Sequence, residues 1–499
     1  MPASASRSVC FSDVLLAGGE ADAVAIIDGP RRHTFGELRQ AAGRIVAELA
    51  RGGVAPGARI AILGSNSFFW VAAYLAAMKW GVAVPLSDKN TIEDLAAQAA
   101  WVDCAAVLID RRQQRRLGAG FGSRPAITDA VLTEPGEWLW PDGAVSPDDD
   151  AALMFTSGTT SRPKAVRTTH ANLLANTTSI IEYLGLRPSD RMLVILPFHY
   201  VFGASLLHTH LAAGGSLVLC NTFTFPETSL DLIEKELCTG FAGVPSSFQL
   251  LLRASSYATR PLPSLRIVQQ AGGRLAPALI EELVAAQPHS SVFVMYGQTE
   301  ATARLSYLPP ELLGTKLGSI GSGIPGVELR VLNDAGQTVA EGETGEIVAR
   351  GANVSPGYWN DAEATAEKFP AGDLRTGDLA TVDADGYIWI VGRRGDFIKS
   401  WGYRISPAQI EEAALGYPGV AGAAAVGLPD PEAGEAIALA VTAIQESELD
   451  SAGLLAHLRQ HLPKHVVPSS IHLLDALPMT ASGKVAKAEL RELLGMPAR

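Results

Sequence analysis

The sequence predicts an α/β protein: a large N-terminal domain of two βα lobes and a small β subdomain, followed by a small mobile α+β cap. Three successive sequence patterns along the 499 residues predict this architecture. Short apolar runs first alternate with helical patterns, strands joined by Gly and Asp-Gly turns follow, and a mixed α/β segment ends the chain. We expect the N-terminal domain at 1–392, with its β subdomain at about 318–392, and the cap at 393–499.

The βα pattern occurs twice. In the first lobe "RIAILG", "GVAVPL" and "AAVLID" predict buried, mostly parallel strands, and "FWVAAYLAAMK" predicts a helix that Lys79 ends. Such a helix is too short to cross a bilayer. A Pro-rich and acidic loop, "EPGEWLWPDGAVSPDDD", separates this lobe from the second, in which "MLVILP", "SLVLC", "RIVQQAG" and "VFVMYG" predict further strands.

The last two parts are distinguished by turns and charge. "VELRVLNDAGQTVAEGETGEIVAR" and "LATVDADGYIWIVGR" predict antiparallel hairpins. The cap starts at "RRGDFIKSWGYR", which carries four basic residues and one acid inside an acidic protein. A hinge and a mobile lid would explain this local charge.

Composition limits the function classes. The net charge of -12 argues against a nucleic-acid partner, and 47% hydrophobic with 18% charged residues is typical of a globular protein. The four cysteines form no CxxC pair, which indicates reduced thiols and no zinc site. With no signal peptide or membrane segment in the pattern, we expect a soluble cytoplasmic protein, either a monomer or a homodimer.

The loop "FTSGTTSRPKAV" is a candidate phosphate site, because its amides, hydroxyls and lysine can converge on an anion. It is not a nucleotide-triphosphatase P-loop, since Pro163 and Ala165 flank Lys164. Alone, it is about as consistent with a structural turn; its place between an apolar strand and a helix beginning near Asn172 favours phosphate binding. The candidate ligands are Thr156, Ser157, Gly158, Thr159, Thr160 and Lys164.

Three later motifs could complete a nucleotide site. In "MYGQTEATA" the Tyr296 ring can stack on a purine, Thr299 can contact a phosphate, and Glu300 is a hard oxygen ligand for Mg²⁺. Asp378 in "LRTGDL" can take both hydroxyls of a ribose, and Lys484 in "LPMTASGKVAKAEL" sits on a turn ahead of a helix. Taken alone, the first motif could be a common helix start, and an Asp turn and a solvated lysine are the more common explanations of the other two, so the case depends on their combination.

Together with "HTFGELRQAAGRIVAELA" and "AAMKWGVAVPL", these motifs resemble, over essentially the whole chain, the adenylate-forming superfamily of acyl-CoA synthetases, peptide-synthetase adenylation domains and firefly luciferase. The resemblance implies that the loop from Thr156 to Lys164 holds the β and γ phosphates of ATP and that Lys484 bridges the attacking carboxylate and the α phosphate. The other implied ATP contacts are Tyr296 at adenine, Thr299 at the α phosphate, Glu300 with Thr156 at Mg²⁺, and Asp378 with Arg393 at the ribose; Gly297 is a further implied ATP contact.

The resemblance also implies two half-reactions, acyl-AMP formation and transfer to a thiol, with rotation of the cap between them. Gly402 would line a pantetheine tunnel, with Lys399 or Arg404 near the new site. The usual hinge position holds Gly395, followed by Asp396, so the pivot residue stays open. The loop also has Ser161 and Ala165 where relatives have Gly, and we expect phosphate binding to persist.

The acid pocket is predicted around "LPFHYVFGAS". His199 follows Phe198 where amino-acid-activating relatives have Asp, so an α-amino acid is disfavoured. His199 either gates the carboxyl end of the pocket, as the motif favours, or is a core histidine. Arg304 either recognises a polar group on the acid or forms a surface salt bridge, and the sequence favours the salt bridge. A fatty acid and an aryl acid both fit the predicted lining of Phe202, Val244, Ser246, Ser247, Gly272, Gly273 and Met295.

The thiol acceptor is expected in trans, because no carrier domain follows Lys484 in the sequence. CoA is favoured, since Arg394, Lys399 and Arg404 could meet its phosphates; the phosphopantetheine of a separate acyl carrier protein is the alternative. A non-catalytic nucleotide or acyl-CoA sensor ranks lower, because Glu300, Asp378 and Lys484 are all present. A luciferase-type oxygenase would keep the same motifs and is the rarer outcome.

Overall fold

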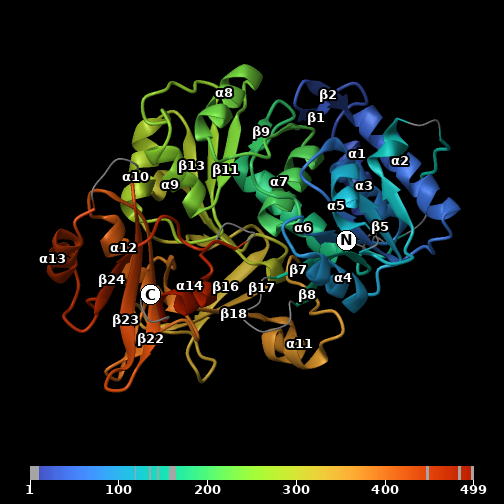
Figure 1. Cartoon of the computed structure of the whole chain (residues 1–499). Helices are drawn as coiled ribbons and strands as arrows, with labels where there is room; N and C mark the ends of the chain where they lie inside the picture. Colours follow the sequence, from blue (N-terminus) through green and yellow to red (C-terminus); the bar gives the residue numbers. More distant parts are fainter. Residues whose placement is uncertain are drawn as a thin grey trace.

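The computed structural model describes residues 10–118, 120–133, 136–142, 145–156, 164–444, 449–480 and 485–495. The described strands form four sheets: one in each of two α/β lobes, one in a small β subdomain and one in the C-terminal cap (Figure 1). The predicted α/β class, with a large N-terminal part and a smaller C-terminal part, is confirmed.

The first lobe contains a six-stranded sheet whose central strands are the predicted apolar runs. Its order is β6 (Ala126–Thr128), β5 (Ala106–Ile109), β3 (Arg59–Leu63), β4 (Val82–Leu86), β7 (Asp150–Phe155) and β8 (Ala165–Thr169). Only the β7–β8 pair is antiparallel. On one face, α4 (Ile92–Trp101) and α5 (Arg111–Leu117) cover an apolar cluster.

The second lobe contains a nine-stranded sheet that recruits the beginning of the chain. Its order is β15 (Ser322–Gly323), β14 (Ser306–Leu308), β13 (Ser291–Tyr296), β12 (Ile267–Gln270), β11 (Gly240–Gly243), β9 (Arg191–Val194), β10 (Ser216–Leu219), β1 (Val24–Asp28) and β2 (Arg31–Thr34). β1 pairs in parallel with β10, about 190 residues later. One face is covered by α8 (Pro226–Glu236), α9 (Pro245–Arg253) and α10 (Pro277–Ala286).

The largest core lies between these two sheets. Helices fill the space: α1 (Phe11–Ala17), α2 (Phe35–Arg51), α3 (Phe68–Trp80), α6 (His170–Leu184) and α7 (Val201–Ala212). α3 is apolar on all sides because both sheets enclose it. The prediction that Lys79 ends this helix is wrong: Lys79 lies inside it, and its ammonium pairs with Asp13 at 2.9 Å. Within the described ranges no helix is both long and apolar enough to traverse a bilayer.

The β subdomain is an antiparallel sheet of β16 (Val327–Leu332), β17 (Gly345–Gly351), β18 (Leu374–Val382) and β19 (Ile388–Arg393), with α11 (Ala362–Lys368) beside it. The short helices η1 (Asp129–Leu132), η2 (Thr299–Ala301), η3 (Pro310–Leu312) and η4 (Pro370–Gly372) lie in loops.

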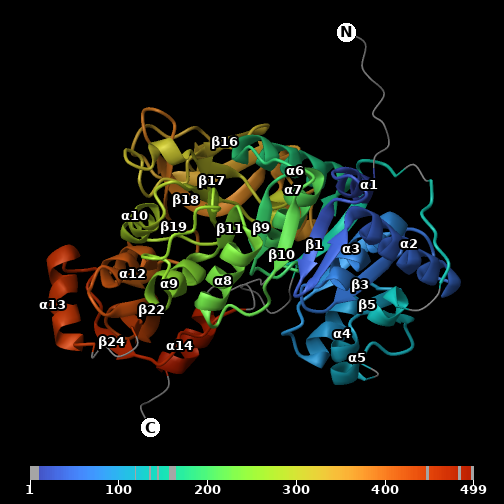
Figure 2. The same ribbon diagram turned by 90° about the horizontal axis from the view of Figure 1, so that it is seen from above.

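The cap sheet has the order β21 (Tyr403–Ile405), β20 (Ile398–Ser400), β23 (Gly434–Ala443) and β22 (Val420–Asp430), and β24 (Ser470–Leu473) also pairs with β23. Its helices are α12 (Pro407–Leu415), α13 (Ser451–His461) and α14 (Lys487–Gly495). Figure 2 shows the cap at the end of the molecule next to α9, on the side of the second lobe. An ion pair of 2.8 Å between Arg274 and Glu412 joins the second lobe to the cap.

Candidate active site

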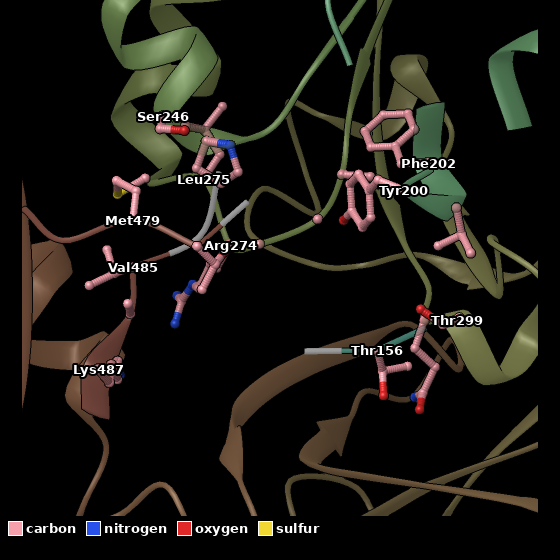
Figure 3. Close-up of a pocket in the computed structure, with 18 of the residues that line it drawn as sticks. Thr156, Tyr200, Phe202, Ser246, Arg274, Leu275, Thr299, Met479, Val485 and Lys487 are labelled. Carbon is pink, nitrogen blue, oxygen red and sulfur yellow. The ribbon is translucent and has the colours of Figure 1, made fainter. Parts of the chain in front are cut away.

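A cleft of about 3240 Å³ opens where the two lobes, the β subdomain and the cap meet. Its walls come from the segments after β7, β12 and β13, from the turn before Asp378 in β18, and from the cap residues around Met479 and Val485. Ligands bind at the carboxyl ends of parallel strands in open α/β sheets, and three of these segments lie there. Figure 3 shows Thr156 and Thr299 on one side and Met479, Val485 and Lys487 on the other.

The base of the predicted phosphate loop is held by β7 and β8. Thr156 N–H donates to the Lys164 carbonyl at 3.0 Å, which continues the β7–β8 ladder by one pair. Both residues line the cleft, and the Lys164 ammonium lies 4.8 Å from the centre of the Tyr358 ring. Of the other predicted phosphate ligands, Ser157, Gly158, Thr159 and Thr160 lie outside the described residues.

Glu300 is positioned on η2 with its carboxylate toward the cleft. The Tyr358 hydroxyl donates to Glu300 Oε1 at 2.8 Å, and the Glu300 carbonyl accepts from Ser355 N–H at 2.9 Å. The second carboxylate oxygen has no hydrogen bond within the described part of the chain. Burial and this carboxylate raise the pKa of Tyr358, so its hydroxyl stays protonated and can donate.

These oxygens suit Mg²⁺, which prefers hard oxygen ligands and binds through one or two carboxylates together with substrate phosphates. Glu300 Oε2 and the Thr156 hydroxyl are oxygen donors that line the same cleft. In the described ranges, no group of three or more His, Cys, Asp or Glu side chains could hold a metal by itself. Glu300 and Thr156 can therefore hold Mg²⁺ only when a bound polyphosphate supplies further oxygen ligands.

The predicted nucleoside contacts meet at the edge of the β subdomain. The Tyr296 hydroxyl donates to Asp378 Oδ2 at 2.5 Å, and Arg393 Nε lies 3.6 Å from Oδ1. Burial and the Asp378 charge both raise the pKa of Tyr296, which keeps the phenol neutral. Thr376 Oγ1 accepts from Asp378 N–H at 3.1 Å, which orients the turn. Tyr296, Gly297, Asp378 and Arg393 all line the cleft.

The predicted acid pocket lies beside β12 and α7. His199, Phe202, Ser246, Gly272, Gly273 and Met295 line the cleft. A Cβ on Gly272 would lie 2.9 Å from the Tyr200 hydroxyl and 2.9 Å from Val244, and its φ of +84° also favours glycine. Val244 and Ser247 are buried and do not appear among the described lining residues. Burial lowers the pKa of His199 to about 4, so the imidazole is neutral near pH 7.

The environment of Arg304 differs from the one that the sequence favoured. Arg304 is 2% exposed and forms no ion pair with any described residue, so the predicted surface salt bridge is wrong. It lines the cleft, and its guanidinium lies 4.0 Å from the centre of the Phe202 ring.

The cap presents its C-terminal segment to the cleft. Lys484 lies outside the described residues, but its flanking residues Met479 and Val485 pair as an antiparallel bridge and line the cleft. Lys399, Gly402 and Arg404 lie on the β20–β21 hairpin and are not among the described lining residues, whereas Gly395 and Asp396 are.

Asp396 at the predicted hinge is tied to the last helix. Its carboxylate pairs with Lys487 at 3.2 Å and lies 3.8 Å from Arg491. Gly395 adopts a φ of +91° in the turn that Asp396 N–H closes to the Arg393 carbonyl. That backbone conformation favours glycine at this position.

Sequence reasoning missed two side chains of the cleft. Tyr358 lies in "SPGYW", which carries no recognisable motif, and Lys368 ends α11 as an ordinary last-turn base. Lys368 donates to the Thr376 carbonyl at 2.9 Å, and burial lowers the pKa of its ammonium, although Glu300 opposes this effect.

Comparisons with known proteins agree with this geometry. The family model "AMP-binding enzyme" matches residues 16–359, and "AMP-binding enzyme C-terminal domain" matches residues 409–484. The chain is 35% identical to a feruloyl-CoA synthase of Amycolatopsis sp, over 95% of this chain and 96% of that protein.

Solved structures match over nearly the whole length. The o-succinylbenzoate CoA synthetase of Bacillus subtilis, in complex with its acyl-adenylate intermediate, superposes with a TM-score of 0.87 at 29% identity, over 99% of both chains. ATP-bound MatB from Rhodopseudomonas palustris gives 0.89 at 27% identity, over 98% of this chain and 99% of that one. The apo form of MatB gives 0.78, so the present arrangement is more similar to the ATP-bound form.

Proposed function

Because the chain belongs to the AMP-binding enzyme family, we propose that it is an AMP-forming acid–CoA ligase. It activates a carboxylic acid with ATP to an acyl-adenylate, releases pyrophosphate, and transfers the acyl group to the thiol of CoA. The observation that carries this proposal is the shared cleft, in which Lys164, Glu300 and Asp378 line the same cavity as an apolar pocket.

ATP binding is assigned to the polar side of the cleft. Asp378, oriented by Tyr296 and Arg393, holds the ribose hydroxyls, and the Tyr296 ring packs against adenine. Lys164 and the loop before it hold the terminal phosphates, and Thr299 contacts the α phosphate. The Tyr296 hydroxyl then shares Asp378 with the ribose, since a carboxylate has acceptor sites for both.

Mg²⁺ is assigned to Glu300, with the Thr156 hydroxyl beside it, and when bound it neutralises charge on the phosphates. The chain's own cations act in the same direction. Lys164 and Lys368 line the cleft, and Lys368 donates to the Thr376 carbonyl of β18 and interacts with the charge of Glu300 in η2. Positive groups held in place before the reaction stabilise the charge that develops on pyrophosphate as it leaves.

The acyl-adenylate forms when a carboxylate oxygen of the acid attacks the α phosphorus in line with the departing pyrophosphate. We assign to Lys484 the role of offsetting the repulsion between the carboxylate and the α phosphate, because its flanking residues already line the cleft. In the second half-reaction the CoA thiolate attacks the acyl carbonyl and AMP leaves. The cap rotates between the steps and exchanges the Lys484 segment for the hairpin of Lys399, Gly402 and Arg404, with the pivot at Gly395 or Asp396.

The acid has an apolar body, and an aryl acid is favoured over a fatty acid. Phe202, Tyr200 and Met295 line the pocket, and an aromatic ring can stack or make edge contacts with such side chains. The feruloyl-CoA synthase and o-succinylbenzoate CoA synthetase relatives are named for aryl acids. Neutral His199 at the carboxyl end provides a hydrogen-bonding group without a competing charge.

CoA is the proposed acceptor because these relatives are CoA ligases. A separate acyl carrier protein is the second candidate, since its phosphopantetheine would enter by the same route. Trp401 and Tyr403 on the β20–β21 hairpin are exposed and are not among the described lining residues, so they could give a protein acceptor an apolar contact.

The test is acid-dependent ATP–pyrophosphate exchange over a panel of aryl and aliphatic acids. The best acid is then offered CoA or a phosphopantetheinylated carrier, and AMP and the thioester are counted. The proposal predicts exchange without any thiol and one AMP per acyl-CoA. Formation of ADP, or no exchange with any acid, would contradict it.

A further inference from the structure

Arg304 is a buried cation in the wall of the acid pocket, in the loop between η2 and β14. Its backbone is held firmly: its carbonyl accepts from the side-chain amides of Asn176 at 3.0 Å and Asn353 at 2.8 Å. Both asparagines are buried. This anchoring sets where the guanidinium can reach.

The guanidinium packs among apolar and aromatic groups. Its Nε donates to the Met295 sulfur at 3.3 Å, a weak acceptor, and its plane lies over the Phe202 ring. The Tyr183 hydroxyl donates to the same sulfur at 3.1 Å and also interacts with the Arg304 side chain, as the Tyr200 phenol does. Burial lowers the pKa of Arg304, and these two phenols oppose that effect.

This cation has no anionic partner in the described chain. No described Asp or Glu forms an ion pair with it, and its Nη2 finds no acceptor there. An arginine cannot lose its charge at neutral pH, so burial without an anion is costly. The cation–π contact with Phe202 offsets only about 1 to 2 kcal/mol and supplies no hydrogen-bond acceptor.

We propose that Arg304 binds a second carboxylate on the acid, so that the preferred substrate is a dicarboxylic acid with an apolar body between its two carboxyl groups. This inference deepens the proposed function and depends on it. A carboxylate matches the guanidinium fork and neutralises its charge, whereas a phenol would leave the charge uncompensated. The apolar body then lies against Phe202 and Met295, between Arg304 and His199.

The experiment compares matched acids in wild type, Arg304→Met and Arg304→Lys. Each pair consists of a dicarboxylic acid and an acid with the same body but a different group at one end. 4-Carboxycinnamate is paired with 4-hydroxycinnamate and with 4-methylcinnamate, and octanedioate is paired with octanoate. Arg350→Met is the control, because Arg350 is exposed, pairs with Asp373 outside the cleft lining, and leaves Asp373 paired with Arg330.

In wild type the dicarboxylic member of at least one pair should give the higher kcat/KM in ATP–pyrophosphate exchange. Arg304→Met should lower that value about 10- to 100-fold, mostly through KM, while leaving the monocarboxylic partner unchanged or improved. Arg304→Lys keeps the charge but not the fork, so its loss should be smaller. Arg350→Met should match wild type.

Thermal shift with acid alone, without ATP, separates this inference from the proposed function. If no acid supports exchange, the proposed function fails, yet a shift by the dicarboxylic acid in wild type that Arg304→Met abolishes would still support Arg304 as its ligand. A monocarboxylic or phenolic preference in every pair, equal losses for both members in Arg304→Met, or no dicarboxylic shift in either readout would overturn the inference. If Arg304→Met does not fold, Arg304→Lys decides by the same comparison.

Discussion

Tyr358 should control the magnesium requirement through Glu300, and Tyr358→Phe is the perturbation that tests this. The variant removes one hydrogen bond, 2.8 Å long, to a carboxylate, and keeps the ring over which the Lys164 ammonium lies. A hydrogen bond to a charged group contributes about 1.5 to 3 kcal/mol. Because Glu300 is half-buried and water can replace part of that bond, we expect about 1.4 kcal/mol, or tenfold, in the Mg²⁺ concentration that gives half-maximal exchange.

The assay is ATP–pyrophosphate exchange titrated with Mg²⁺ in wild type, Tyr358→Phe, Glu300→Ala and the double variant. If Tyr358 acts by orienting Glu300, removing its hydroxyl should change little once Glu300 is Ala. Tyr417→Phe, in the cap and away from the described cleft lining, is the control. An equal tenfold effect in both backgrounds, or an unchanged Mg²⁺ titration in Tyr358→Phe, would refute the reasoning.

Three further results are expected. Lys484→Ala should suppress pyrophosphate exchange much more than thiol transfer from preformed acyl-AMP, and equal losses would contradict its assignment to the first step. Burial lowers the pKa of His208 to about 3 and of His210 to about 4. In the unfolded chain both histidines have a pKa near 6.5, so below that pH the unfolded state binds protons that the native state does not bind. The free energy of unfolding that the two histidines contribute should fall by about 2.7 kcal/mol per pH unit as pH drops from 6.5 towards 4. In urea melts at several pH values, His210→Gln should reduce this dependence on pH by about half of that amount. An unchanged pH dependence in the variant would mean that His210 does not contribute to it. Glu412→Ala removes the half-exposed ion pair with Arg274, so exchange should fall by no more than about fivefold, and a loss above fiftyfold would mean that this pair controls the cap.

The fold could be predicted where periodicity is strong and local. The apolar runs that form β3, β4, β5, β9, β10, β12 and β13 predict buried strands, and α6 begins at His170, close to the predicted start at Asn172. The addition of β1 to the second sheet depends on pairing with β10 far along the chain, which no local pattern encodes. The end of the helix at Lys79 is predicted wrongly because the partner of this lysine, Asp13, lies 66 residues away in the sequence.

The site could be predicted where a residue belongs to a motif and not where it acts through a distant partner. Glu300 and Asp378 lie in motifs, whereas Tyr358 contacts Glu300 from the loop between β17 and α11, far along the chain. Arg304 follows a motif residue by only four positions, yet its burial arises from Phe202 on α7 and Met295 on β13. A charged residue is usually exposed, so a salt bridge was the natural expectation from sequence.

The most direct test of the central claim, attack of the acid on the α phosphorus of ATP, follows the oxygen atom. An acid that supports exchange is labelled with ¹⁸O in both carboxylate oxygens and incubated with ATP, Mg²⁺, CoA and the enzyme, and the nucleotide is analysed by mass spectrometry. The account predicts AMP that carries one ¹⁸O and unlabelled pyrophosphate. Label in inorganic phosphate beside ADP, or AMP without label, would contradict it.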